Sequence, residues 1–147
     1  MTTIRTVLAI AAIAAVLSSC GGGSPADPAT GERGAVETVF RGYHEALHVR
    51  DFTTACSLNA PEKSAELIEK LAAKGATVSS CEEALRMVFT LPQAADSADR
   101  IATTLQVDDV TVDGDNATIT WSARGQSRGQ PTTSALRRID DQWRLLP

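Results

Sequence analysis

The sequence has no apolar run long enough to cross a membrane. Its N-terminal apolar stretch, Val7–Val16, has ten residues and follows a single positive charge at Arg5. A membrane-spanning helix needs about 20 apolar residues, whereas a stretch of this length is typical of a secretory signal peptide. No twin-arginine pair precedes it. The sequence therefore predicts that residues 1–19 form a signal peptide for the general secretion route.

The chain also lacks a strong excess of charge of either sign. It carries 14 Lys and Arg against 18 Asp and Glu, which gives a formal net charge of −4. Loss of the signal peptide would remove Arg5 and change this value from −4 to −5. A mildly acidic domain with dispersed charges gives no reason to expect a nucleic-acid partner.

Cysteine is scarce, with three residues and no C-x-x-C motif of the kind that redox catalysts use. The first of them, Cys20, ends the segment Leu17-Ser18-Ser19-Cys20 directly after the apolar stretch. This segment resembles the lipobox of bacterial lipoproteins. The resemblance implies that Cys20 carries a lipid and anchors the protein to the cell membrane, on its extracytoplasmic face. The alternative is an ordinary secretory signal that contains a cysteine by chance.

The remaining cysteines, Cys56 and Cys81, form an even pair in a compartment that permits disulfides. A bond between them would close a loop of 26 residues. On the chain-entropy model, such a loop stabilises the fold by roughly 3.5 kcal/mol. The alternative is a pair of buried free thiols.

The chain after the lipobox divides into a tether and one domain. Residues 20–34 begin with Gly21–Pro25 and show no apolar periodicity, so we expect a flexible tether. Residues 35–147 have the length of a single ordinary domain.

Helical spacing and capping residues predict helices in the first part of this domain. Alternating apolar residues and turn sequences predict two β-hairpins in the second part. The domain is therefore expected to be α+β, with helices packed on an antiparallel sheet. Residues 94–104 are ambiguous between a short helix and an irregular link. The predicted helices span residues 35–50, 51–58, 61–75 and 80–91, and the predicted strands span 107–112, 117–121, 132–139 and 142–146.

The domain resembles the nuclear transport factor 2-like superfamily, in its branch of secreted bacterial lipoproteins. The resemblance implies a curved sheet that the helices wrap into a cone-shaped pocket, with Phe40, Tyr43 and Trp121 as candidate pocket residues. Members include enzymes, carriers and domains without a known ligand, so the fold alone does not define a function. Members often pair through the sheet, which allows a homodimer. The segments that carry the resemblance are Tyr43, Ala46-Leu47, Asp51-Phe52, Ala55-Cys56, Leu58, Pro61, Cys81, Ala84-Leu85, 110–115, 117–119 and 143–145.

One segment, His44-Glu45-Ala46-Leu47-His48, matches the H-E-x-x-H pattern of zinc hydrolases. In that reading His44 and His48 hold zinc and Glu45 activates a bound water. The match is incomplete, because Ala46 replaces the usual bulky apolar residue and the chain has no third histidine. Helix geometry places His44 at the boundary of the apolar face and His48 largely in solvent, whereas a catalytic zinc needs a shielded cleft.

The pattern as a whole favours a non-catalytic lipoprotein without a cofactor. We expect it to bind a small apolar ligand in the cone or an envelope protein partner. The alternatives are a zinc hydrolase that uses His44, Glu45 and His48, or an acid/base enzyme of the isomerase or cyclase type that uses pocket residues such as Tyr43 and Asp51. A ligand carrier requires an accessible apolar cavity beneath Tyr43 and Trp121, whereas an adaptor protein should have a filled cone.

Overall fold

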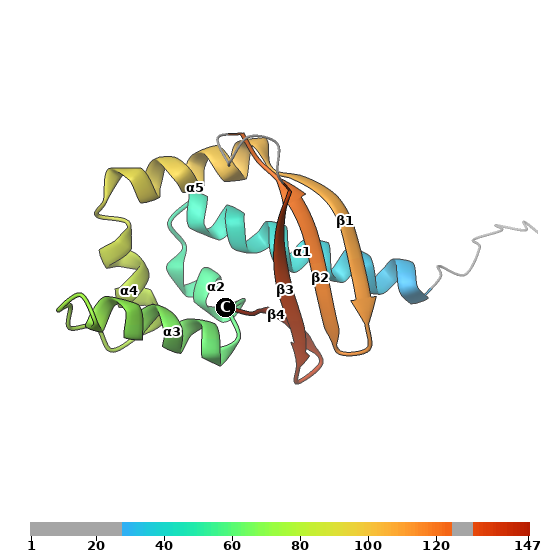
Figure 1. Cartoon of the computed structure of the whole chain (residues 1–147), viewed down its shortest axis with the longest axis horizontal. Coiled ribbons are helices and arrows are strands. Elements are labelled where there is room, and N and C mark those ends of the chain that lie inside the picture. The colour runs from blue at the N-terminus through green and yellow to red at the C-terminus, as the bar shows by residue number, and fades with distance from the viewer. Residues whose placement is uncertain (1–27, 125–130) are drawn as a thin grey trace, which may run out of the picture.

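A computed structural model describes residues 28–124 and 131–147. The predicted signal peptide and Cys20 lie outside these residues. The described part is α+β, as predicted, with five helices followed by four antiparallel strands (Figure 1). None of these helices combines the length and the apolar character that a membrane crossing requires. The elements are α1 (Pro28–His48), α2 (Phe52–Ser57), α3 (Pro61–Ala72), α4 (Cys81–Val88), α5 (Pro92–Thr104), β1 (Gln106–Asp113), β2 (Asn116–Ser122), β3 (Thr132–Ile139) and β4 (Gln142–Leu145).

Helix α1 begins earlier than predicted. It starts at Pro28, so the tether predicted for residues 20–34 is wrong over residues 28–34, which are helical. Contacts with the sheet explain the longer helix: Glu32 pairs with Arg138, and Arg33 lies 3.0 Å from Asp109. Composition alone could not reveal these partners, because they lie far away in the sequence.

The next three helices agree with the capping signals. Asp51 accepts a hydrogen bond from the Thr54 amide at 3.0 Å and so caps α2. Ser80 accepts one from the Glu83 amide at 3.2 Å and caps α4. The Glu83 carboxylate returns to the backbone of Ser79 at 2.8 Å, one residue before the position that a capping box predicts.

Helix α5 resolves the ambiguous segment 94–104 as helical. Pro92 stands in the first turn of α5. Proline suits that position because the amide that it lacks would have no partner there.

The strands form one sheet in the order β1-β2-β3-β4, so that β1 and β4 are its two edges. The turn between β1 and β2 places Gly114 at a φ of 56°, a conformation that glycine adopts without strain. The turn between β3 and β4 places Asp140 and Asp141 at φ values of 50° and 60°. Aspartate tolerates this left-handed region better than most residues.

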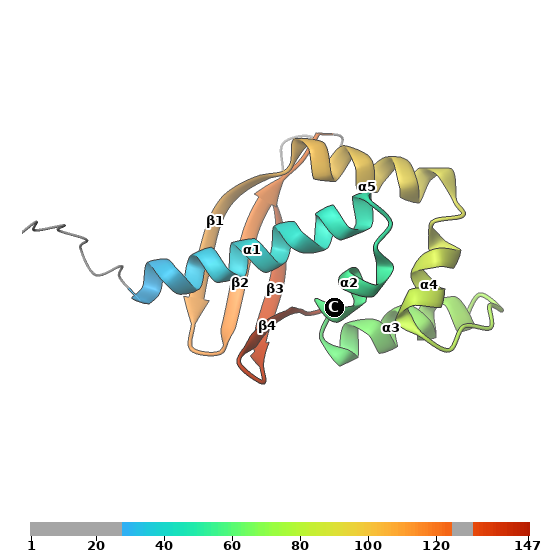
Figure 2. The same cartoon turned by 180° about the vertical axis from the view of Figure 1, so that it is seen from behind.

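Helix α1 crosses one face of the sheet, as both views show (Figures 1 and 2). The alternation of side chains turns every second strand residue toward it. The opposite face carries exposed threonines, among them Thr111, Thr118 and Thr133. The main core lies between α1 and the sheet and consists of Val36, Phe40, Val110, Ala117, Ile119, Trp121, Leu136, Trp143 and Leu145.

Helices α2, α3 and α4 gather around the C-terminal end of α1 (Figure 2). Their own core is small and contains Ala46, Ala55 and Leu85. The structure brings Cys56 and Cys81 to disulfide-bonding distance, with their Cα atoms 5.9 Å apart. The predicted pair therefore links α2 to the start of α4.

Candidate functional site

Four rings meet where α1 faces β2. Phe40, Tyr43 and His44 come from α1, and Trp121 comes from β2. The His44 ring centre lies 4.7 Å from that of Phe40 and 5.2 Å from that of Trp121. Exposed fractions of 0% for Phe40 and 5% for Trp121 make these two predicted pocket residues part of the core. Tyr43 and His44 instead reach two separate pockets at the surface.

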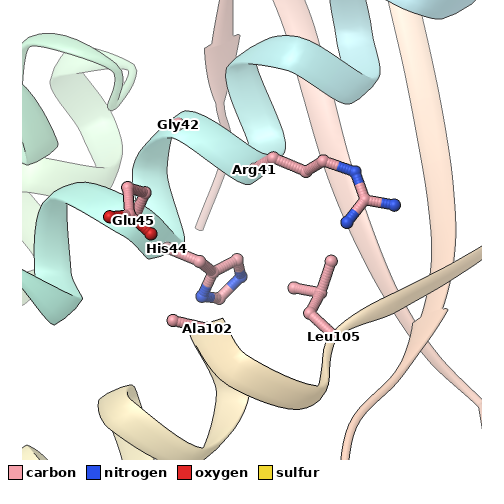
Figure 3. A pocket seen from close by; sticks show the side chains of 6 residues that line it. All are labelled: Arg41, Gly42, His44, Glu45, Ala102 and Leu105. Atoms are coloured by element: carbon pink, nitrogen blue, oxygen red, sulfur yellow. The ribbon is translucent and has the colours of Figure 1, made fainter.

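The first pocket, which we call the His44 pocket, lies between α1 and α5 and has a volume of about 290 Å³. Figure 3 shows the His44 ring pointing toward Ala102 of α5, with Leu105 on the other side of the opening. Arg41 extends along the rim on the Leu105 side. Its Nε donates to Glu37 at 2.7 Å, which leaves its other nitrogens for further bonds.

His44 has an environment that keeps its imidazole neutral. Burial, helped by the positive charge of Lys63, lowers the pKa of His44 to about 4. A neutral imidazole donates from one nitrogen and accepts at the other. His44 therefore offers the pocket one uncharged polar group beside the charged side chains of Arg41 and Glu45.

The H-E-x-x-H segment does not converge on one point. Glu45 is exposed and lines the same pocket as His44 (Figure 3). His48 Nδ1 lies 3.1 Å from Asp99 Oδ1, and Arg50 also pairs with this carboxylate at 3.0 Å. The contact with Asp99 leaves the His48 side chain 37% exposed. His48 is therefore less exposed than the helix geometry predicted. Within residues 28–124 and 131–147, no three His, Cys, Asp or Glu side chains are grouped as metal ligands.

The second pocket, which we call the Tyr43 pocket, lies beside α3 and has a volume of about 210 Å³. Burial raises the pKa of the Tyr43 phenol, and a hydrogen bond from Asn59 opposes this rise. No local pattern indicated Asn59, because its position depends on a bridge to Leu145 of β4. The pocket is lined by Tyr43, Asn59, Lys63, Glu66, Leu67, Lys70, Leu85 and Pro147.

Two arginines of β3 pair with acidic residues of the helices. Arg137 pairs with Glu62 of α3, and Arg138 pairs with Glu32 of α1. Arg138 also stacks on the Trp143 ring, with its guanidinium carbon 4.8 Å from the ring centre. These contacts give both arginines a structural role in joining helices to the sheet.

The chain matches no protein family, curated protein or solved structure in our comparisons. The description of the protein therefore rests on its structure. It is an α+β domain with small pockets on either side of the C-terminal half of α1.

Proposed function

We propose that this protein is a lipid-anchored, extracytoplasmic binding protein that holds a small apolar ligand in the His44 pocket. The observation that carries the proposal is the neutral imidazole of His44 in a pocket that Ala102 and Leu105 line together with Gly42 and the charged residues Arg41 and Glu45. Small-molecule sites combine mostly apolar walls with a few polar groups that fix orientation. A ligand that fits is a compact apolar molecule with one polar end, which bonds His44 or the free nitrogens of Arg41.

Two features support a non-catalytic role. A general base works best with a pKa near the operating pH, and the pKa of His44 at about 4 makes it a poor proton acceptor from a substrate. His48 is bonded to Asp99 and does not line the His44 pocket. The zinc-hydrolase alternative would require the two histidines to turn toward one another.

The anchor and the fold family belong to the same proposal. The lipobox at Cys20 supports attachment to the extracytoplasmic face of the cell membrane. The order of helices and strands, with α1 lying across the sheet, supports a domain of the nuclear transport factor 2-like type. The ring cluster of Phe40, His44 and Trp121 would then fill the interior of the cone, so the cavity expected beneath Tyr43 and Trp121 is closed and the proposed ligand site lies at the surface beside His44. An envelope protein or a second copy of the chain remains an additional partner to test for.

The anchor is tested with Cys20→Ala in the full chain, and Ser24→Ala serves as a control that keeps the lipobox. We expect the Cys20→Ala protein to leave the membrane fraction and the Ser24→Ala protein to stay there. Unchanged membrane fractionation of Cys20→Ala would refute lipid attachment at this residue.

The pocket is tested by NMR with benzoate as the probe, in full-length protein purified with detergent. The chain has two histidines, so a His48→Gln variant assigns their ring resonances. We expect benzoate to shift the His44 resonances and leave those of His48 in place. Ala102→Trp should fill the pocket and abolish the shift. A shift that persists in Ala102→Trp, or no His44 shift in the native chain, would contradict the proposal.

A further inference from the structure

The outer edge of β1 carries backbone groups that no described strand bonds. The Arg138 amide of β3 donates to the Asp115 carbonyl at 2.7 Å, which fixes the alternation along β2: one set of its residues bonds β3 and the other set bonds β1. Thr111 is one of the β1 residues that bond β2. Its neighbours Val110 and Val112 therefore turn their N–H and C=O groups outward, to a side where no described strand lies (Figure 1).

Two pockets lie along this edge, between β1 and the N-terminal half of α1. Their volumes are about 360 and 450 Å³, and Arg33 and Val110 line both of them. From α1, the small residues Thr30 and Gly34 line the larger one. A strand added beside β1 would place every second side chain on the α1 side, over Val110 and Val112. The pockets leave room for small apolar side chains at these positions.

The charge of β1 restricts what could pair with it. The strand contains Asp108, Asp109 and Asp113 but no lysine or arginine, and all three aspartates are exposed. Two β1 strands from separate copies would place carboxylates against carboxylates, which disfavours self-pairing. A segment that carries positive charge would instead be attracted to this edge.

Arg33 of α1 crosses the edge of β1 and pairs with Asp109 at 3.0 Å. Asp109 also accepts a hydrogen bond from Thr111 Oγ1 at 3.1 Å, on the sheet face opposite α1. Both partners of the ion pair are about half exposed, at 52% and 56%. Ion pairs in such positions contribute little to stability, so a basic side chain of a partner could replace Arg33 at Asp109.

We propose that the outer edge of β1 binds an extended basic segment of a partner protein, which adds to the sheet as a further antiparallel strand. Its backbone would bond Val110 and Val112, and its small apolar side chains would face α1. Its lysines or arginines would lie on the other face, beside Asp109 and Asp113. This surface is separate from the His44 pocket, so the two proposals can fail independently.

The test is an NMR titration of the full chain, in a neutral detergent, with a hexapeptide of alternating lysine and valine. In the free chain, the amide protons of Val110 and Val112 should exchange with solvent faster than that of Thr111, which bonds β2. We expect the peptide to protect both valine amides. Methylation of the backbone nitrogens of the peptide's valines should abolish binding, because these nitrogens face β1. Methylation at its lysines is the matched control and should preserve binding.

Variants of β1 separate backbone pairing from charge attraction. Val112→Pro removes an outward N–H without breaking a bond to β2, so we expect a folded protein that no longer binds the peptide. Val112→Ala keeps this N–H and should still bind. Asp113→Asn should weaken binding about threefold, whereas Asp96→Asn on the exposed side of α5 should leave it unchanged.

Arg33→Ala should strengthen binding about threefold, because the peptide no longer competes with Arg33 for Asp109. Arg100→Ala removes the same charge from an exposed position on α5 and is its control. Ala102→Trp should bind the peptide as the native chain does, because it alters only the His44 pocket. Absence of binding, equal binding of a glutamate–valine hexapeptide, or equal binding of the two methylated peptides would overturn the proposal.

Discussion

The two halves of the domain are built in different ways. The sheet half, which comprises β1–β4 and the part of α1 above them, has a core that includes two tryptophans and the fully buried Phe40, Ile119 and Leu136. The helical half, which comprises α2–α4 and the end of α1, buries only Ala46, Ala55 and Leu85 in its cluster. Helix α3 has no buried residue. Its link to the rest therefore relies on half-buried contacts and on the Cys56–Cys81 pair.

This difference bears on the two pockets at the C-terminal half of α1. Large side chains fill the centre of the space between α1 and the sheet. The His44 pocket opens where α5 meets α1, and the Tyr43 pocket opens beside α3 in the helical half. Both pockets thus lie at the margin of the packed core.

The largest expected effect comes from a cavity in the sheet half. Leu136→Ala should destabilise the protein by about 4 kcal/mol, because the residue is fully buried and its neighbours cannot close the gap. Leu67→Ala makes the same deletion on half-buried α3 and should cost about 1 kcal/mol. Urea unfolding followed by tryptophan fluorescence measures both values. Equal losses would contradict the distinction between the halves.

A somewhat smaller effect should follow removal of the disulfide. Cys56→Ser combined with Cys81→Ser should cost about 3.5 kcal/mol, because the unfolded chain regains the freedom of the closed loop. Hydrogen exchange should then show loss of protection first in α3 and α4, while β2 and β3 stay protected. Uniform loss across the sheet would show that the two halves unfold as one unit.

The third prediction concerns pH and His44, at the junction of the halves. Its folded pKa of about 4 lies below the ordinary value of 6.5, so only the unfolded chain takes up a proton as the pH falls below 6.5. Stability should therefore drop by about 2 kcal/mol between pH 7 and pH 5, with the remaining loss complete near pH 4. His44→Leu should remove this dependence, and His48→Leu should retain it. Urea unfolding at pH 7, 6 and 5 measures the dependence of the unfolding free energy on pH. The same dependence in the native chain and in His44→Leu would show that His44 is not its source.

The fold class was predictable because its signals are local. The caps at Asp51 and Ser80 and the glycine turn at Gly114 act within a few residues, so periodicity and turn chemistry located the elements. The start of α1 was missed because it depends on distant partners in the sheet. The helical state of residues 94–104 was ambiguous, since their few apolar side chains pack only once α1 is in place.

The candidate sites were predictable only in part. The family resemblance named Phe40, Tyr43 and Trp121 as pocket residues, but it could not separate core from pocket, because that depends on where Trp121 of β2 lies. The H-E-x-x-H pattern indicated a shared function for two histidines. In the structure they have different partners, because His44 packs against Trp121 and His48 contacts Asp99. Asn59 carried no local signal, since its burial results from contacts with β4.

Native mass spectrometry of the full chain, extracted gently from membranes, tests the central claim most directly. We predict one small organic molecule per polypeptide, beyond the mass of the lipid and with two hydrogens missing for the disulfide. The Ala102→Trp protein should lack this molecule. A native chain without any bound molecule, or one that keeps it in Ala102→Trp, would contradict a carrier that uses the His44 pocket.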